Sequence, residues 1–212
     1  MNFKNNTTQS DYADQLKQKI SENAATVGVI GLGYVGLPLA HALHGGGLSI
    51  VGFDVDESKI ESIASKQNYL KHLGNDIFEN LSDSPRFTAT TDFSNLKSCD
   101  VIIICVPTPL GHHQEPDLSY IINSAKHIGR SLRPGQLIIL ESTTYPRTTR
   151  DEMLPAILDA ASEQDQYVIG ENIFVAFSPE REDPGRKDHS TSTIPKLVGG
   201  VDERSTTLAA QV

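Results

Sequence analysis

Residues 26–36 read TVGVIGLGYVG, a short apolar run that stops at the first of three closely spaced glycines. The apolar run over residues 26–30 predicts a buried β-strand, and the pattern over residues 34–44 predicts a helix. Pro38 falls in the first turn of that helix, where its missing N–H leaves no hydrogen bond unmade. The glycine triplet at 45–47 ends the helix. A strand, a glycine-rich turn and a helix therefore follow one another directly.

The three glycines fit the pattern G-x-G-x-x-G in the strand-to-helix context that identifies a phosphate-binding turn. Gly31 permits the tight turn, Gly33 lets the backbone approach a diphosphate, and Gly36 lets the helix pack closely on the strand. The N–H groups and the positive end of the helix then attract the anion. A glycine turn without a ligand, and a flavin or S-adenosylmethionine site, are the alternatives that this pattern leaves open.

An acidic residue stands where a dinucleotide-binding turn needs one. Asp54 ends the second predicted strand, about 20 residues after the glycines, the spacing at which a carboxylate reaches the adenosine ribose. Such a carboxylate accepts hydrogen bonds from both ribose hydroxyls and repels a 2′-phosphate. Asp56 and Glu57 follow, and no arginine lies within three residues of Asp54. The sequence therefore predicts NAD rather than NADP as the cofactor.

Short apolar runs alternate with amphipathic stretches along the rest of the chain. Further strands are predicted over residues 48–54, 87–91, 101–106, 136–140, 173–177 and 196–198. Further helices are predicted over residues 10–22, 57–66, 117–132 and 147–162, in part of 67–86, and from 202 onward. Strands that are apolar throughout are buried on both faces, which is typical of a parallel sheet built from βαβ units. The predicted fold class is α/β, with a doubly wound, mostly parallel, Rossmann-like sheet.

The chain divides into two unequal parts. Residues 1–25 are polar and are predicted to form an N-terminal extension with a short helix, whereas residues 26–212 are predicted to form the Rossmann-like NAD-binding domain. The sequence stops inside a helical pattern, without a capping residue or a terminal glycine. We therefore expect a fragment of a larger multi-domain chain, with the central and C-terminal domains absent.

The composition is that of a globular protein, since 38% of the 212 residues are hydrophobic and 21% are charged. The net charge of −9 excludes the basic surface that nucleic-acid binding needs. No apolar run approaches the ~18 residues of a membrane-spanning helix, and the first 25 residues lack the apolar core of a signal peptide. We therefore expect a cytoplasmic protein that binds neither nucleic acid nor a membrane.

Polar or proline-rich segments directly follow three of the predicted strands. These segments are residues 107–109, 141–144 and 178–185. Ligands of doubly wound sheets bind outside the carboxyl ends of the strands, so the three segments and the glycine turn can form one site. The alternative is that prolines and threonines merely terminate these strands.

Five motifs together resemble the UDP-glucose/GDP-mannose dehydrogenase family. They are GLGYVGLPLA, VPTP, EST, SPEREDPG and IPKLVGG, in this order, within a match that runs from about residue 26 to the end. The match resembles the N-terminal, NAD-binding domain of that family. SPEREDPG resembles the branch that oxidises UDP-N-acetylhexosamines, UDP-N-acetylglucosamine above all, to uronic acids for surface polysaccharides. Pro184 stands where enzymes acting on UDP-glucose carry a second glutamate, which argues against that substrate.

The resemblance implies a role for each matching residue. The turn from Gly31 to Gly36, with Tyr34 and Val35, would hold the diphosphate, and Asp54 would bind the ribose with Lys59 nearby. Val106, Pro107 and Thr108 would line the cofactor, and Ser142 and Thr143 would lie beside the nicotinamide. Thr143 and Glu180 would be catalytic, Glu180 by assisting proton transfer and water activation. No metal is expected, because His112 and His113 lack a third ligand at a suitable spacing.

The family reaction also needs a residue that this sequence lacks. Oxidation of the sugar C6 alcohol to a carboxylate uses two NAD⁺ and an activated cysteine thiolate, which forms a thioester that water cleaves. In the family this cysteine lies in a Gly-Gly-x-Cys motif, and no such motif occurs here. Cys99 precedes a strand at the edge away from the cofactor, and Cys105 lies in an apolar run. The chain alone is therefore expected to bind NAD without completing turnover.

The sequence leaves three alternatives for the function of the protein. The substrate of the full-length enzyme, expected to be a homo-oligomer, could instead be UDP-glucose, UDP-N-acetylmannosamine or UDP-N-acetylgalactosamine. A non-catalytic NAD-binding module is a second class of function. A third is another NAD enzyme, such as a 6-phosphogluconate-like or 3-hydroxy-acid dehydrogenase, which shares the glycine turn but not SPEREDPG.

Overall fold

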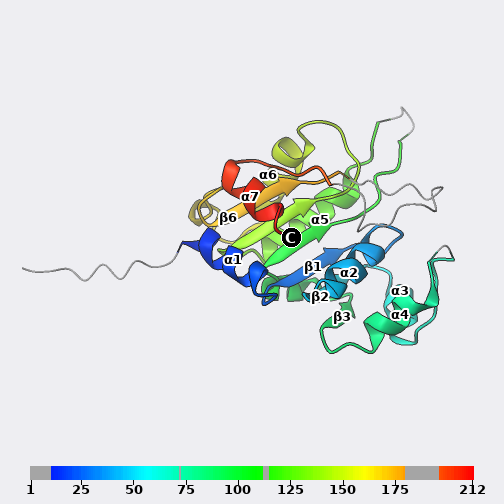
Figure 1. The fold of residues 1–212 in the computed structure, drawn as a ribbon. Coiled ribbons are helices and arrows are strands. Elements are labelled where there is room, and N and C mark those ends of the chain that lie inside the picture. The colour runs from blue at the N-terminus through cyan, green and yellow to red at the C-terminus, as the bar shows by residue number, and fades with distance from the viewer. Residues whose placement is uncertain (1–10, 72, 112–114, 180–195) are drawn as a thin grey trace, which may run out of the picture.

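In the computed structural model the chain folds into a doubly wound α/β domain (Figure 1). The structure describes residues 11–71, 73–111, 115–179 and 196–212. The sheet runs in the order β3-β2-β1-β4-β5-β6-β7. Its strands are β1 (Thr26–Ile30), β2 (Ser49–Phe53), β3 (Phe87–Thr90), β4 (Val101–Ile104), β5 (Gln136–Leu140), β6 (Ile173–Phe177) and β7 (Gly199–Gly200). All neighbouring strands pair in parallel except β7, which is antiparallel to β6. The predicted α/β class and mostly parallel sheet are confirmed.

Helices cover both faces of the sheet (Figure 1). They are α1 (Tyr12–Ser21), α2 (Gly36–Gly45), α3 (Glu57–Ala64), α4 (Asn75–Ser82), α5 (Ser119–Arg130), α6 (Leu154–Ala160) and α7 (Glu203–Ala209). The shorter turns are η1 (Phe93–Ser98), η2 (Thr149–Met153) and η3 (Gln164–Gln166). None of the helices in the described ranges is both long enough and apolar enough to cross a membrane.

Two hydrophobic cores lie on opposite faces of the sheet because consecutive strand residues point to opposite sides. In β4, Val101 and Ile103 join the core beneath α1, α2, α4 and α7, and Ile102 and Ile104 join the core beneath α5 and α6. All four side chains are buried. The central strands are thus apolar along their whole length, which explains why the sequence pattern predicted them.

Two predicted elements differ from the structure. The strand predicted over residues 196–198 is wrong, because the pairing with β6 occurs one step later, at Gly199–Gly200. Leu197 is instead 59% exposed. The helix predicted over residues 147–162 starts with a π-helical turn, Thr149–Met153, and continues as α6. Pro155 at the start of α6 has no N–H to donate, so the wider turn precedes it.

Helix α1 of the N-terminal extension packs against the amino-end side of the sheet. Its residues Leu16 and Ile20 are buried in the first core, and Lys19 donates to the Asp100 carboxylate at 2.7 Å. Burial alone would raise the pKa of Asp100, but hydrogen bonds from Lys19, the Thr26 N–H and Arg133 outweigh it and hold the pKa below its ordinary value. These polar contacts fasten α1 to the edge opposite the glycine turn.

Candidate functional site

The strand order places a crevice at the carboxyl ends of β1 and β4. From β1 the chain continues outward to β2 and β3, whereas β4, β5 and β6 follow on the other side of β1. In such a sheet the connections of the two halves diverge at the point where the order reverses, which is where ligands bind. The glycine turn after β1 and the segment after β4 meet here, since the Cys105 N–H donates to the Ile30 carbonyl at 2.8 Å.

Gly31 and Gly36 have conformations and surroundings that only glycine fits. Gly31 has φ +94°, and a Cβ added there would lie 2.6 Å from the Cys105 carbonyl oxygen. A Cβ at Gly36 would overlap the Gly31 carbonyl oxygen, so α2 starts directly against the turn. The Gly31 N–H donates to the Phe53 carbonyl at 2.7 Å and ties the turn to β2. The two glycines therefore shape the turn itself.

Gly33 differs from the other two because its surroundings are open. Apart from the residue itself and its two chain neighbours, no atom of the described residues lies within 4 Å of a Cβ built on Gly33. Among the described residues nothing accepts a hydrogen bond from the Gly33 N–H, and Val35, the N-cap of α2, makes no side-chain capping bond. The start of this 10-residue helix thus presents N–H groups and a positive dipole end to an approaching anion.

Asp54 lies beside this turn, at the end of β2. Its carboxylate is buried, with 5% of the residue exposed. Oδ2 accepts from the Leu32 N–H at 2.8 Å, and Oδ1 accepts from the Asp56 N–H at 3.0 Å. The carboxylate is therefore held against the glycine turn by backbone donors.

Lys59 forms an ion pair with this carboxylate. Its Nζ lies 2.8 Å from Asp54 Oδ2, and its side chain is about one-third exposed. The resemblance implied that Lys59 lies near the ribose, and the structure brings it to Asp54. This amine reduces the net negative charge beside the expected 2′ position.

The residues predicted after β4 and β5 are joined to each other. Thr108 Oγ1 donates to the Thr143 carbonyl at 2.6 Å, and Ser142 Oγ donates to the Val106 carbonyl at 2.7 Å. Ser142 is buried, whereas Thr143 is exposed. The Ser142 hydroxyl therefore supports the neighbouring strand end, and Thr143 faces solvent from the same edge. Glu180, Pro184, His112 and His113 lie outside the described residues.

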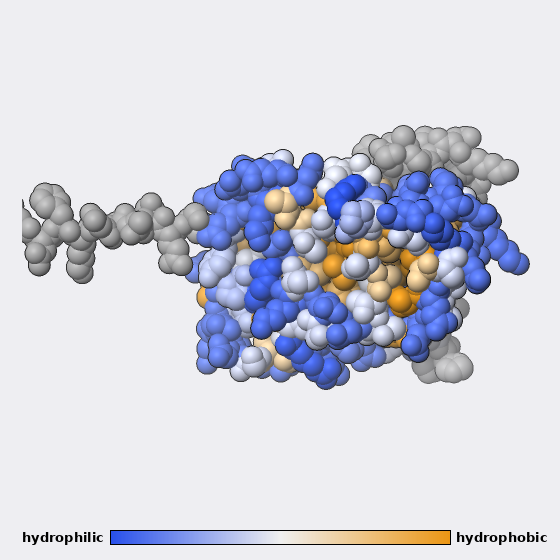
Figure 2. All heavy atoms as spheres, turned by 90° about the horizontal axis from the view of Figure 1, so that it is seen from below, coloured by the Kyte–Doolittle hydropathy of each residue, from blue (hydrophilic) through white to orange (hydrophobic). Residues whose placement is uncertain are grey.

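Exposed apolar side chains flank this edge of the sheet. Tyr34 in the glycine turn is 52% exposed, Val55 after Asp54 is 79% exposed, and Leu110 after the β4 segment is 69% exposed. Figure 2 shows one face of the molecule on which hydrophobic residues gather within a border of hydrophilic ones. A flat aromatic or apolar part of a ligand can pack on such side chains.

Both cysteines are buried and lack the features of a nucleophile. Burial raises the pKa of the Cys99 thiol to about 11, and the residue precedes β4 at the amino-end edge. Cys105 is 8% exposed and its Cβ lies beneath the start of α2. A reactive thiolate needs exposure and a lowered pKa. Neither cysteine can therefore supply the nucleophile of the family reaction.

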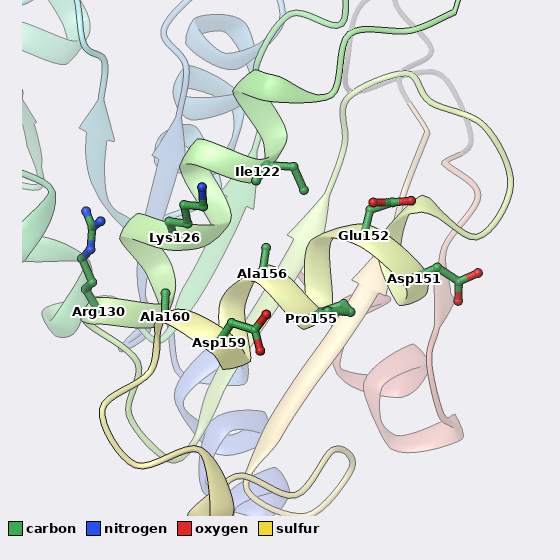
Figure 3. Close-up of a pocket in the computed structure, with 9 residues that line it drawn as sticks. All are labelled: Ile122, Lys126, Arg130, Asp151, Glu152, Pro155, Ala156, Asp159 and Ala160. Atoms are coloured by element: carbon green, nitrogen blue, oxygen red, sulfur yellow. The ribbon is translucent and has the colours of Figure 1, made fainter.

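A second hollow lies between α5 and α6, away from the glycine turn (Figure 3). It has a volume of about 530 Å³. Its lining residues are Ile122, Lys126, Arg130, Asp151, Glu152, Pro155, Ala156, Asp159 and Ala160. Basic side chains come from α5, and acidic ones come from η2 and α6. This mixture of charges selects no one class of ligand.

The sequence assigned no individual role to four polar side chains near the crevice. The Tyr69 hydroxyl donates to the Leu32 carbonyl at 2.6 Å. Lys196 forms an ion pair with the buried Glu141, directly before Ser142. The Ser178 hydroxyl is buried and has no hydrogen-bond partner among the described residues. The only sequence signal was the presence of Glu141, Ser178 and Lys196 in the quoted motifs, and Tyr69 had none.

The chain is similar to nucleotide-sugar dehydrogenases in sequence and in fold. The profile of the UDP-glucose/GDP-mannose dehydrogenase family, NAD binding domain, matches residues 25–212. Over 174 residues the chain is 37% identical to Protein CapL of Staphylococcus aureus and 36% identical to UDP-N-acetyl-D-glucosamine 6-dehydrogenase of Pseudomonas aeruginosa. Each match covers 82% of the chain and 39% of the relative.

A solved structure shows the same arrangement of strands and helices. The UDP-D-ManNAc dehydrogenase of Pyrococcus horikoshii superposes with a TM-score of 0.77 at 30% identity, over 88% of this chain and 43% of that one. The chain therefore spans about two-fifths of the length of the curated relatives that it matches. These findings confirm the resemblance on which the site residues were assigned.

Proposed function

Because the chain belongs to the UDP-glucose/GDP-mannose dehydrogenase family and matches its NAD-binding domain, we propose that it binds NAD at the crevice between β1 and β4. The observation that carries this proposal is the buried Asp54 carboxylate, which accepts a hydrogen bond from the Leu32 N–H of the glycine turn. This pairing sets an anion-binding turn and a ribose-binding carboxylate side by side. Both belong to one dinucleotide site.

Each part of the cofactor then has a defined place. The N–H groups at the start of α2 bind the diphosphate across the open side of Gly33. Asp54 would accept hydrogen bonds from the adenosine ribose hydroxyls, with the Lys59 ammonium 2.8 Å from its Oδ2. The other lining residues come from the ends of β4 and β5. They are Val106, Pro107, Thr108, Ser142 and Thr143.

The bound NAD supplies a hydride acceptor, and residues of this chain orient it. Thr108 holds the Thr143 carbonyl, so the ends of β4 and β5 are joined into one wall that would face the nicotinamide. Rigid walls keep reacting groups in the geometry of the transition state. Thr143 is exposed at this wall and can contact the sugar. We assign catalytic roles to Thr143 and Glu180, with Glu180 assisting proton transfer.

The whole protein is proposed to oxidise the C6 alcohol of a UDP-N-acetylhexosamine to the uronic acid, for surface polysaccharide. UDP-N-acetylglucosamine is supported by the 36% identical relative that carries this name. The Pyrococcus horikoshii structure supports UDP-N-acetylmannosamine as the competing substrate. We further propose that the enzyme is cytoplasmic and forms a homo-oligomer. In this proposal the chain supplies the cofactor domain, and the cysteine that the family reaction needs would come from elsewhere in the whole protein.

The choice between NAD and NADP tests the role of Asp54. We expect the chain to bind NAD at least about 10-fold more tightly than NADP, because the 2′-phosphate would lie against the Asp54 carboxylate. In Asp54→Asn this preference is expected to fall to about 3-fold or less, since the freed Lys59 amine then attracts the phosphate. Isothermal titration calorimetry with both cofactors measures the two ratios.

A neighbouring carboxylate provides the control for this experiment. Asp56 is exposed and caps α3 by accepting from the Ser58 N–H. Asp56→Asn is expected to keep the wild-type preference for NAD because its carboxylate accepts from the Ser58 N–H of its own helix. Equal affinities of the wild-type chain for NAD and NADP would show that Asp54 does not face the ribose.

A further inference from the structure

We propose that Tyr69 is a positioning residue of the glycine turn: its hydroxyl fixes the Leu32 carbonyl and thereby aims the Gly33 N–H at the diphosphate. Tyr69 lies between α3 and α4, far along the chain from the turn. Its Oη donates to the Leu32 carbonyl at 2.6 Å. This inference rests on the proposed NAD function and assigns a role to a segment that no motif covers.

The N–H, the carbonyl and the side chain of Leu32 are each held by a different part of the fold. Its N–H donates to Asp54, its carbonyl accepts from Tyr69, and its side chain is fully buried. A Cβ at Gly52 would lie 2.9 Å from Leu32 Cδ2, so the side chain is seated directly on β2. The residue between the first two glycines of the turn is therefore fixed in position and in orientation.

Fixing this carbonyl also fixes the next N–H group. The peptide bond between Leu32 and Gly33 is planar and trans, so its C=O and N–H point in opposite directions within one plane. Because the Leu32 carbonyl points to Tyr69, the Gly33 N–H points away from it. Glycine allows wide rotation about its own backbone bonds. Without the Tyr69 contact, this peptide would lose the bond that sets its plane.

The Tyr69 ring is itself firmly seated. It packs edge-on against Phe78 of α4, with ring centroids 5.3 Å apart and an interplanar angle of 80°. Phe78 is fully buried. Asn68 fixes the backbone that follows Tyr69, since its Oδ1 accepts from the Leu70 N–H at 2.7 Å and its Nδ2 donates to the Leu73 carbonyl at 2.8 Å. The hydroxyl thus reaches Leu32 from a ring that packs against Phe78 and from a backbone that these hydrogen bonds hold.

The hydroxyl stays a donor throughout the working pH range. Burial raises the pKa of Tyr69 well above its usual value, and the negative charges of Asp54 and Asp56 raise it further. A protonated phenol has one hydrogen to give, and the Leu32 carbonyl accepts it. The contact is therefore present wherever the domain is folded at neutral pH.

Tyr69→Phe tests this role because it removes only the hydroxyl and keeps the ring against Phe78. We expect the Kd for NAD and the Kd for ADP to rise roughly 3- to 10-fold, the effect of losing one neutral hydrogen bond. The affinity for adenosine, which lacks the diphosphate, is expected to stay within about 2-fold of wild type. Calorimetric titration with NAD, ADP and adenosine provides the three values.

Tyr167→Phe is the matched control. The Tyr167 hydroxyl also donates to a backbone carbonyl, that of Leu132, at 2.8 Å and away from the turn. Both variants lose a bond of the same kind, and only Tyr69→Phe is expected to lose NAD affinity. An unchanged NAD affinity in Tyr69→Phe, or an equal loss for adenosine, would overturn the proposal. Failure of the wild-type chain to bind NAD would instead contradict the proposed function itself.

Discussion

Replacing Gly33 with alanine is expected to weaken NAD binding by roughly 100-fold or more while leaving the unliganded fold intact. The free chain has room for the added methyl group, since no atom lies within 4 Å of its position. The same methyl group would occupy the space through which the diphosphate approaches the backbone. The substitution is therefore expected to weaken ligand binding without destabilising the fold.

Calorimetric titration measures the affinity for NAD, and thermal unfolding measures the stability of the unliganded fold. Gly45→Ala is the control, because Gly45 at the other end of α2 is equally open. It is expected to leave NAD affinity unchanged and to raise stability slightly, since alanine favours a helix more than glycine does. If Gly33→Ala bound NAD like wild type, the diphosphate could not lie on this turn.

Alanine at Gly36 is expected to destabilise the unliganded fold, whereas alanine at Gly33 is expected to weaken NAD binding. Gly36→Ala should lower the free energy of unfolding by about 3 kcal/mol, because the new Cβ overlaps the Gly31 carbonyl oxygen. Backbone atoms cannot swing away as a side chain can, so β1 and α2 would have to separate. The loss would appear with no ligand present.

Urea unfolding of wild type, Gly36→Ala and Gly45→Ala measures this effect. We expect the midpoint of Gly36→Ala to fall strongly and that of Gly45→Ala to stay the same or rise. NAD should then stabilise Gly36→Ala less than wild type, because the displaced helix no longer presents its N–H groups. A Gly36→Ala chain as stable as wild type would show that the helix does not pack directly on the turn.

The strands and the glycine turn could be predicted because burial leaves a local signal. Val101 and Ile103 face one core and Ile102 and Ile104 face the other, so the whole strand is apolar. The turn could be recognised since its three glycines stand between such a strand and a helix. In both cases the physical cause acts within a few neighbouring residues.

Strand β7 could not be predicted because its pairing uses only backbone groups. Gly199 and Gly200 have no side chains to form a pattern, and they pair with Phe177 and Ala176 of β6. The predicted strand was therefore placed at the neighbouring apolar residues 197–198, which is wrong. A strand of two glycines becomes visible only when its partner is known.

The contacts that fix the turn could not be predicted because they join distant parts of the chain. Tyr69 reaches Leu32 only after α3 has folded against the sheet, and no spacing rule links the two. The Lys59 contact with Asp54 differs, because the two residues lie five positions apart in the chain and the family resemblance had already placed Lys59 near the ribose. Local sequence therefore predicts which residues form the turn, and tertiary packing decides which others hold it.

NMR titration of the ¹⁵N-labelled chain with NAD tests most directly whether the diphosphate binds at the glycine turn. We expect the largest amide shifts at Gly33, Tyr34 and Val35, with further shifts at Asp54 and Thr108. Amides of α5 and α6, which line the hollow in Figure 3, should not shift. Saturable binding whose shifts cluster between α5 and α6, with Gly33 unmoved, would contradict the account.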